Sequence, residues 1–356
     1  MLFEEPILQW LLQNGGFMDS QVFILNEKRN VTLTAYLQDD SQEFWRAKKR
    51  PAVVIFPGGA YAYCSDREAD PVAQEYLRAG YHAFVLRYSV GWENAVWPNP
   101  LEDYDQAMEL IAAHAKEWHL IPEKIAVIGF SAGGHLAACA ATMAKHRPAA
   151  AILAYPVILE GLAAICAKGA PGADKAVDSQ TCPCFIAATG TDTTVSAMNS
   201  LRFVEALYEN GISAELHLYA FGPHGFSTAR TSIADPAELC NRTLHWVEDS
   251  ISWLEDVFGA FTSGEMSSPR CPGRVRKDKD PYLSVDCLLA TIAENQIAVE
   301  RLNQLILVEE TTQKWIAEQK ENLLTSEMTL RSALQFLNVP GEVIRKADEI
   351  LSEIPN

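Results

Sequence analysis

Short runs of apolar and β-branched residues alternate with longer stretches of helical periodicity from about residue 21 to residue 258. This alternation is typical of a mainly parallel sheet that is covered by helices on both faces. Eight runs predict strands, at residues 22–25, 31–37, 52–56, 82–88, 124–130, 150–155, 184–190 and 214–219. The turn-like sequence NEKRN joins the first two runs and predicts an antiparallel hairpin at one edge of the sheet.

The segments between these runs carry apolar residues at three- and four-residue spacing, which predicts helices. They lie at residues 71–79, 103–118, 132–146, 200–210 and 236–258. The last segment is expected to cover the sheet and close the domain. We therefore expect an α/β fold with an eight-stranded, mainly parallel sheet, in a first domain that spans residues 1–261.

Residues 262–281 interrupt every periodicity with glycine, proline, serine and mixed charges, as is typical of a linker. The basic residues of this stretch alternate with acids. That mixture favours a solvated linker over a tail that binds nucleic acid. A domain boundary is therefore expected here.

Residues 282–356 are expected to form a helical extension. Its first part repeats apolar residues at three-four spacing with one polar residue in the row: Val285, Leu288, Ile292, Asn295, Val299, Leu302 and Ile306. The pattern is typical of a short coiled coil and predicts a homo-oligomer held by these helices. A helical module that folds back on residues 332–351 would give the same pattern at this length, so both alternatives stay open.

The composition bounds the partners. With 356 residues and 48% hydrophobic residues, the chain can bury one large core and a second, smaller one. Its net charge of −17 argues against nucleic acid and anionic membranes as partners, because phosphate binding needs a basic face. No apolar run approaches the ~20 residues that a membrane-spanning helix needs.

The cysteines and the N-terminal sequence predict a compartment. Eight cysteines are scattered along the chain without the dense spacing of a secreted disulfide scaffold, so reduced thiols are expected. Residues 1–16 lack the cationic start and small-residue cleavage site of a signal peptide. Cytoplasmic localisation is the resulting expectation.

The sequence GFSAG at residues 129–133 predicts a nucleophile. The pattern Gly-x-Ser-x-Gly alone is a weak signal, but here it follows a predicted strand directly and opens an alanine-rich helix. A serine on so sharp a turn has a strained backbone, and side chains two residues away would clash, which explains Gly129 and Gly133. The hydroxyl of Ser131 would stand exposed at the start of the helix, with the N–H of Ala132 aimed at a developing oxyanion.

A base and an acid are predicted near this serine. His224 lies in a Gly/Pro loop after the eighth strand, and Asp192 lies just past the seventh, in the chain order Ser, acid, His expected for a nucleophile elbow. Asp178 is the alternative acid. His135 is the rival base, but its place on the helix that carries the nucleophile favours a packing role.

The remaining oxyanion donor is expected from the sequence FPGGAY after the third strand, where Gly59 and Ala60 allow backbone N–H groups to approach an ester oxygen. No His, Cys, Asp and Glu residues stand at metal-ligand spacing, so neither a metal nor another cofactor is expected.

Six ordered motifs in residues 20–258 resemble the α/β-hydrolase superfamily. The group they resemble most is that of bacterial esterases and lipases similar to acetyl-xylan and feruloyl esterases, which is related to hormone-sensitive lipase. The motifs are PGGAY, SDREADPVAQEYLRAGYHAFVLRY, WPNPLEDYDQAM, IAVIGFSAGGHLAA, LAYPVI and GPHGFS.

The resemblance implies roles for individual residues. It implies Ser131 as nucleophile, His224 as base and Asp192 as the residue that orients the base. The implied oxyanion donors are the backbone groups of Gly59, Ala60 and Ala132.

Three features depart from the family pattern. Ala60 replaces a glycine, Ser196 stands where the family usually has proline, and residues 159–181 are shorter than the usual cap. The short cap suggests an open pocket. Its expected rim consists of Tyr61, Tyr63, Trp92 and Trp97, whose rings would stack on a sugar or an aromatic acyl group or would only pack the rim. Arg67 is a further expected contact, which would either face the site or pair with Asp66 or Glu68.

These observations favour a serine carboxylesterase that removes short acyl groups, such as acetyl groups on oligosaccharides, through an acyl-enzyme. The expected partner is a small-molecule or oligosaccharide ester. One alternative is a serine peptidase or acyl-aminoacyl hydrolase, since the same residues cleave amides. Another is a non-catalytic scaffold that presents the C-terminal helices.

Overall fold

The computed structural model describes residues 18–39, 43–306 and 310–356. The expected absence of a signal peptide concerns residues 1–16, which lie outside these ranges. The chain divides into two compact units: Met1–Leu207 with Ser213–Gly273, and Tyr208–Ile212 with Arg274–Asn356. The predicted linker at residues 262–281 is shared between them, because its first part belongs to the first unit.

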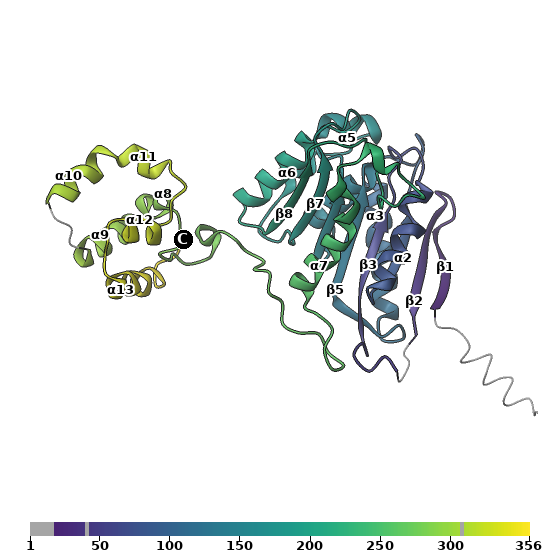
Figure 1. The fold of residues 1–356 in the computed structure, drawn as a ribbon, viewed down its shortest axis with the longest axis horizontal. Helices are drawn as coiled ribbons and strands as arrows, with labels where there is room; N and C mark the ends of the chain where they lie inside the picture. The colour runs from purple at the N-terminus through teal and green to yellow at the C-terminus, as the bar shows by residue number, and fades with distance from the viewer. Residues whose placement is uncertain (1–17, 40–42, 307–309) are drawn as a thin grey trace, which may run out of the picture. The chain divides into compact units, whose positions relative to one another are not determined.

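An eight-stranded sheet organises the first unit (Figure 1). Its strands are β1 (Met18–Asn26), β2 (Val31–Gln38), β3 (Arg50–Phe56), β4 (His82–Arg87), β5 (Leu120–Phe130), β6 (Ala150–Ala154), β7 (Cys184–Thr189) and β8 (Ala214–Tyr219). Their order in the sheet is β1-β2-β4-β3-β5-β6-β7-β8. All eight predicted strands are confirmed, and so is the antiparallel hairpin at the edge.

The pairing of the strands brings the carboxyl ends of several strands to one edge of the sheet. The strand pairs β4–β3, β3–β5, β5–β6, β6–β7 and β7–β8 are parallel. Strand β2 is antiparallel to both of its neighbours, β1 and β4. In β3 every residue is buried, as expected for a central strand covered on both faces. In β2 fully buried residues alternate with partly buried ones.

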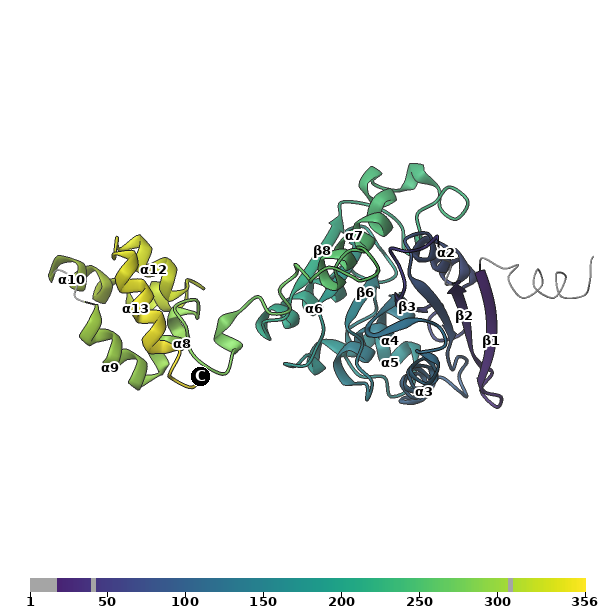
Figure 2. The same ribbon diagram turned by 90° about the horizontal axis from the view of Figure 1, so that it is seen from below.

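Helices cover both faces of this sheet (Figure 2). They are α2 (Asp70–Arg78), α3 (Asn99–His114), α4 (Ala132–Met143), α5 (Glu160–Cys166), α6 (Met198–Glu209) and α7 (Trp246–Phe258). On one face, α2 and α7 pack in a common core with side chains of β3, β4, β5, β6 and β7. On the other face lie α3 and α4 (Figure 2), and α4 is so rich in alanine that its backbone can approach the strands closely.

The predicted helix at residues 236–258 is wrong over its first ten residues. Two short 3₁₀ turns, Pro236–Glu238 and Asn241–His245, precede α7 there. Between them Leu239 and Cys240 have extended backbone and are buried, so the apolar pattern reflects burial without helical geometry. The short helix α5 was not predicted.

The second unit is a small helical module with its own core. Its helices are α8 (Leu289–Glu294), α9 (Gln296–Leu305), α10 (Glu310–Glu318), α11 (Lys320–Leu324), α12 (Leu330–Phe336) and α13 (Gly341–Leu351). Side chains from α8, α9, α12 and α13 share one apolar cluster. The coiled-coil alternative does not match this packing, because the row of apolar residues is divided between α8 and α9. The alternative of a module that folds back on itself agrees with this packing.

Asn295 explains the difference. Its side chain accepts a hydrogen bond from the N–H of Ala298 at 3.1 Å and caps α9, so the chain turns at the residue predicted to lie in a coiled-coil seam. Self-association through these helices stays a prediction.

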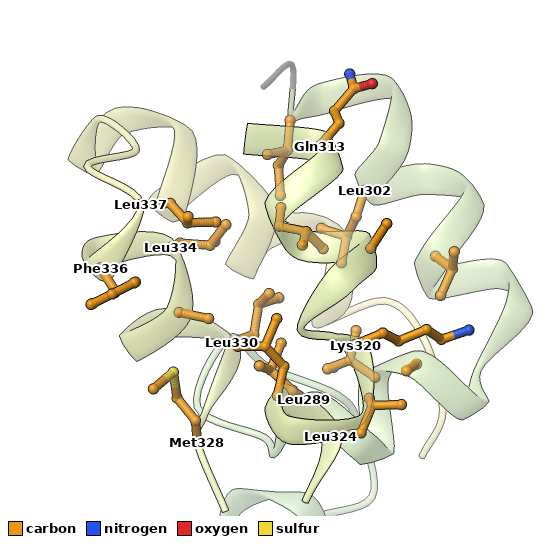
Figure 3. Close-up of a pocket in the computed structure, with 18 of the residues that line it drawn as sticks. Leu289, Leu302, Gln313, Lys320, Leu324, Met328, Leu330, Leu334, Phe336 and Leu337 are labelled. Carbon is orange, nitrogen blue, oxygen red and sulfur yellow. The ribbon is translucent and has the colours of Figure 1, made fainter. Parts of the chain in front are cut away.

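An apolar cavity of about 650 Å³ lies within this second unit (Figure 3). Its lining includes several leucines, among them Leu289, Leu302, Leu330 and Leu334. In the described part of the chain, no helix is both long enough and apolar enough to cross a bilayer.

Candidate active site

Ser131 stands on a sharp turn between the end of β5 and the start of α4. Its backbone has φ 53° and ψ −114°, a conformation that non-glycine residues rarely adopt and that costs about 1–3 kcal/mol. The neighbouring strand holds this turn, because the N–H of Ser131 donates to the carbonyl of Ala154 at 3.0 Å. Its own carbonyl accepts from the N–H groups of His135 and Val157. The strain is thus maintained by bonds on both sides of the serine.

The glycines beside Ser131 are required by close backbone contacts, as the sequence predicted. A Cβ at Gly129 would lie 2.1 Å from the carbonyl oxygen of Gly133. A Cβ at Gly133 would lie 2.1 Å from the carbonyl oxygen of Phe56 at the end of β3. Only glycine lets strand, turn and helix approach this closely.

His224 and Asp192 lie beside the serine. Asp192 follows β7 and His224 follows β8, so both leave the same edge of the sheet as Ser131. The Nε2 atom of His224 is 2.9 Å from Oγ of Ser131, and its Nδ1 is 2.6 Å from Oδ2 of Asp192. The structure therefore brings together the three residues that the sequence predicts as nucleophile, base and orienting acid.

The hydrogen bonds define the protonation of the imidazole. Asp192 also accepts from the N–H groups of Thr194 and Val195, at 2.8 and 2.9 Å, and its side chain is only 2% exposed. Burial opposes ionisation, but the hydrogen bonds from His224 and from these backbone groups outweigh it and hold the pKa of Asp192 below its ordinary value. A carboxylate can only accept, so Nδ1 of neutral His224 carries the proton and Nε2 is free to accept one from Ser131.

Three backbone N–H groups near the serine are available as donors. Within the described residues, those of Gly59, Ala60 and Ala132 donate to no protein acceptor. Gly59 and Ala60 have φ values of 124° and 54°, so the loop after β3 turns sharply. Ala132 begins α4, where the first amides of a helix are unpaired and the helix dipole favours negative charge.

His135 is confirmed as a packing residue and does not act as a rival base. Its Nε2–H donates to the carbonyl of Pro171 at 2.8 Å, and Nδ1 therefore accepts from the hydroxyl of Tyr61 at 2.9 Å. Burial lowers the pKa of His135 to about 4, so the ring is neutral at neutral pH. Asp178, the alternative acid, instead forms a bidentate ion pair with Arg147.

The prediction of Tyr61 on the pocket rim is wrong. The side chain is 1% exposed, and its hydroxyl is bonded to His135 on α4. Its ring also packs edge-on against Tyr88, with centroids 5.5 Å apart. Tyr61 therefore anchors the loop to α4 and is not accessible to a substrate. An amphipathic tyrosine beside glycines gives no sequence signal that distinguishes the two roles.

The other predicted rim residues lie in different surroundings. Tyr63 and Trp92 are exposed, and Trp97 is half-buried with its ring against His135. Arg67 is exposed, and its guanidinium lies over Gly225, the residue after His224. Its acidic neighbours have other partners, because Asp66 pairs with Arg87, and Glu68 accepts from other residues.

Sequence reasoning missed a buried polar group under the site. Glu68 is 2% exposed and accepts from the N–H of Gly58 and the hydroxyl of Tyr155. The sequence Asp-Arg-Glu-Ala-Asp around it is typical of an exposed charged turn. No pattern in it singles out the glutamate that points inward.

No cluster of metal-ligating side chains stands near this site or elsewhere in the described ranges. The chemistry that this arrangement supports is attack by an activated hydroxyl on a carbonyl group, next to unpaired N–H donors that can bind the resulting oxyanion.

The sequence is similar to one family model and to two esterase or xylanase proteins. The model of the BD-FAE family matches residues 43–157. Over 259 residues the chain is 31% identical to endo-1,4-beta-xylanase B of Butyrivibrio fibrisolvens. This match covers 64% of this chain and 38% of that protein. Over 197 residues it is 29% identical to acetylxylan esterase of Xylanibacter ruminicola, with 49% and 41% covered. The chain thus spans about two fifths of the length of these curated relatives.

Solved structures match almost over their full lengths. MGS-M1, an alpha/beta hydrolase enzyme from a Medee basin deep-sea metagenome library, is 41% identical with a TM-score of 0.62. The match covers 67% of this chain and 98% of that one. An acetyl ester-xyloside bifunctional hydrolase from Caldicellulosiruptor lactoaceticus is 29% identical with a TM-score of 0.58, covering 67% and 96%.

Gly129, two residues before Ser131, gives a direct test of the turn. We expect Gly129→Ala to destabilise the first unit by about 3 kcal/mol or more, because its Cβ would overlap the carbonyl of Gly133. Urea unfolding followed by tryptophan fluorescence measures this. Gly161→Ala in α5 is the matched control, since its Cβ meets nothing within 4 Å. Equal stability of the two variants would contradict the described turn.

Proposed function

The chain belongs to the α/β-hydrolase family, and from this premise we propose that it is a serine carboxylesterase that hydrolyses short-chain acyl esters. The observation that carries the proposal is the continuous hydrogen-bonded series from Ser131 through His224 to Asp192. Catalysis is assigned to the domain predicted at residues 1–261, and no cofactor takes part.

Acylation begins with the serine. Nε2 of His224 removes the proton as Oγ of Ser131 attacks the ester carbonyl, and Asp192 stabilises the imidazolium that forms. The negative charge on the carbonyl oxygen is stabilised by the N–H groups of Ala132 and of the Gly59–Ala60 loop. His224 then donates its proton to the departing alcohol, which leaves an acyl group on Ser131.

Deacylation repeats these steps with water. His224 removes a proton from the water molecule as it attacks the acyl carbonyl, and the same N–H groups stabilise the second oxyanion. Collapse of this intermediate breaks the bond to Oγ of Ser131, which recovers its proton from His224. The carboxylic acid is released and the enzyme is restored.

We propose acetylated carbohydrate as the substrate class. Two of the similar proteins are named for acetylxylan and for an acetyl ester-xyloside activity. Tyr63 is exposed and packs against Gly59 of the proposed oxyanion loop. Trp92 is 87% exposed, and the residue before it, Gly91, donates its N–H to the carbonyl of Tyr61 at 2.7 Å. These two rings are therefore suited to stack on a sugar ring beside the reacting ester.

We also propose that the enzyme works in the cytoplasm. All eight cysteines are free thiols in the structure. In the first unit, four of them are fully or nearly fully buried: Cys139, Cys182, Cys184 and Cys240. A reducing compartment keeps thiols in this state.

Replacing the nucleophile tests the reaction. We expect Ser131→Ala to lower kcat for p-nitrophenyl acetate on the order of 10⁴-fold or more and to abolish the burst of p-nitrophenol, since no acyl-enzyme can form. Stopped-flow absorbance measures both.

The control for this variant is Ser250→Ala, which removes a buried hydroxyl of α7 that is bonded to Tyr76 of α2. It should retain wild-type turnover. Undiminished hydrolysis by Ser131→Ala would refute the mechanism, and faster cleavage of an acetyl anilide than of the matching ester would favour the peptidase alternative.

Removing the exposed ring tests the substrate class. We expect Trp92→Ala to lower kcat/KM for acetylated xylo-oligosaccharides roughly five- to tenfold through a higher KM, because one stacking contact contributes about 1 kcal/mol. Turnover of p-nitrophenyl acetate should not change. Trp45→Ala, which removes an exposed tryptophan ahead of β3, is the control. Equal kcat/KM for the oligosaccharide in wild type and Trp92→Ala would contradict the carbohydrate proposal.

A further inference from the structure

A buried carboxylate lies directly behind the proposed oxyanion loop. Glu68 is 2% exposed, and each of its oxygens accepts one hydrogen bond. Oε2 accepts from the N–H of Gly58 at 2.8 Å, and Oε1 accepts from the hydroxyl of Tyr155 at 2.7 Å. Burying a carboxylate is costly unless its oxygens are bonded, so these two contacts are what this position requires.

The carboxylate and the nucleophile flank the same glycine. A Cβ at Gly58 would come within 2.6 Å of Oε2 of Glu68 and within 3.1 Å of the Cβ of Ser131. Gly58 immediately precedes Gly59 and Ala60, the residues that carry the proposed oxyanion donors. A shift of Glu68 would therefore move those donors relative to the serine.

Tyr155 extends the contact to the loop that carries the base. Its hydroxyl donates to Glu68 and accepts from the N–H of Ser227 at 2.9 Å. Its ring packs edge-on against the imidazole of His224, with centroids 5.0 Å apart. Burial, followed by the charge of Glu68, raises the pKa of Tyr155 well above its ordinary value, so the phenol keeps the proton it donates.

A second bond closes the network. The hydroxyl of Ser227 donates to the carbonyl of Arg67 at 2.5 Å. Arg67 is the residue that precedes Glu68 in the chain. The loop with His224 is thus bonded directly to the main chain of the short 3₁₀ turn Asp66–Glu68, and through Tyr155 to the side chain of Glu68. The carboxylate therefore bonds the loops of Gly58 and Tyr155 directly, and Tyr155 in turn bonds the loop of Ser227.

We propose that Glu68 is a positioning residue that fixes the oxyanion loop and the His224 loop relative to each other. The inference rests on the proposed esterase mechanism and goes beyond it, because Glu68 contacts neither substrate nor the reacting atoms. Both of its partners are donors, so both oxygens of the side chain must act as acceptors. A glutamine offers one acceptor oxygen and one NH₂ donor, so either the N–H of Gly58 loses its acceptor or the hydroxyl of Tyr155 must accept in place of donating.

The test is Glu68→Gln in the full chain. We expect kcat for p-nitrophenyl acetate to fall about 10- to 100-fold with KM within twofold of wild type, because a displaced donor or base acts mainly in the transition state. A merely structural role would instead reduce the fraction of folded enzyme. The endpoint of labelling by a fluorophosphonate measures that fraction and should stay at one label per chain.

Asp178→Asn is the matched control. It also removes a carboxylate that bonds an arginine and backbone, but it stands before β7, at the opposite end of the strands from the site. This variant should keep wild-type kcat even where it lowers the unfolding temperature.

Tyr155→Phe is the second variant, and it keeps the test valid if Glu68→Gln does not fold. It removes the hydroxyl that joins Glu68 to Ser227, and kcat should fall roughly tenfold. The double variant should be no slower than the slower single one, since both changes break one network.

Three outcomes would overturn the inference: kcat within threefold of wild type in Glu68→Gln or Tyr155→Phe, a loss of kcat matched by an equal loss of labelling endpoint, or fully additive effects. If wild type itself neither hydrolyses the ester nor takes the label, the esterase proposal fails and the inference fails with it. If the wild type is active and the variants are unaffected, the inference on Glu68 is wrong and the esterase proposal still holds.

Discussion

The turn at Ser131 is the constraint on which the rest of the first unit depends. The chain leaves the buried end of β5, reverses within one residue of positive φ and enters a helix at once. That reversal requires backbones to pass each other at distances that leave no room for a Cβ at positions 129 and 133. In return, one hydroxyl stands at the carboxyl edge of the sheet, at the positive end of α4.

The parallel sheet makes this position useful. Because β5, β7 and β8 run in the same direction, the residues that follow each of them reach the same edge. Asp192 and His224 arrive there from separate loops, and the hydrogen bonds between them orient the imidazole toward the serine. A second layer then fixes these loops from behind. The bond between His135 and Tyr61 connects the loop after β3 to α4, and Glu68 connects the same loop through Tyr155 to the loop of His224.

Sequence patterns predicted the elements that obey periodic rules. The eight strands alternate or run apolar as burial requires, and the GFSAG turn carries its steric reason in its own glycines. The predictions that were wrong concern residues whose role depends on distant partners. Tyr61 belongs to the core because His135 offers an acceptor from another element. Glu68 is buried because a donor from β3's loop and a donor after β6 converge on it.

The helical predictions were wrong for a related reason. The apolar residues Leu239 and Cys240, like Ile292 and Leu302, indicate that one side of the chain is buried. It does not report whether the backbone continues as one helix. Asn295 follows one helix and caps the next. From the sequence alone, a polar residue at this position is equally typical of a coiled-coil seam.

The central claim is that Ser131, His224 and Asp192 act as one unit on an ester carbonyl. Peptide mapping after reaction with diethyl p-nitrophenyl phosphate tests it most directly. The account predicts a single phosphoryl adduct on Ser131, formed at least about 10³-fold more slowly in His224→Ala. An adduct on another residue, or labelling of Ser131 at an undiminished rate without His224, would contradict it.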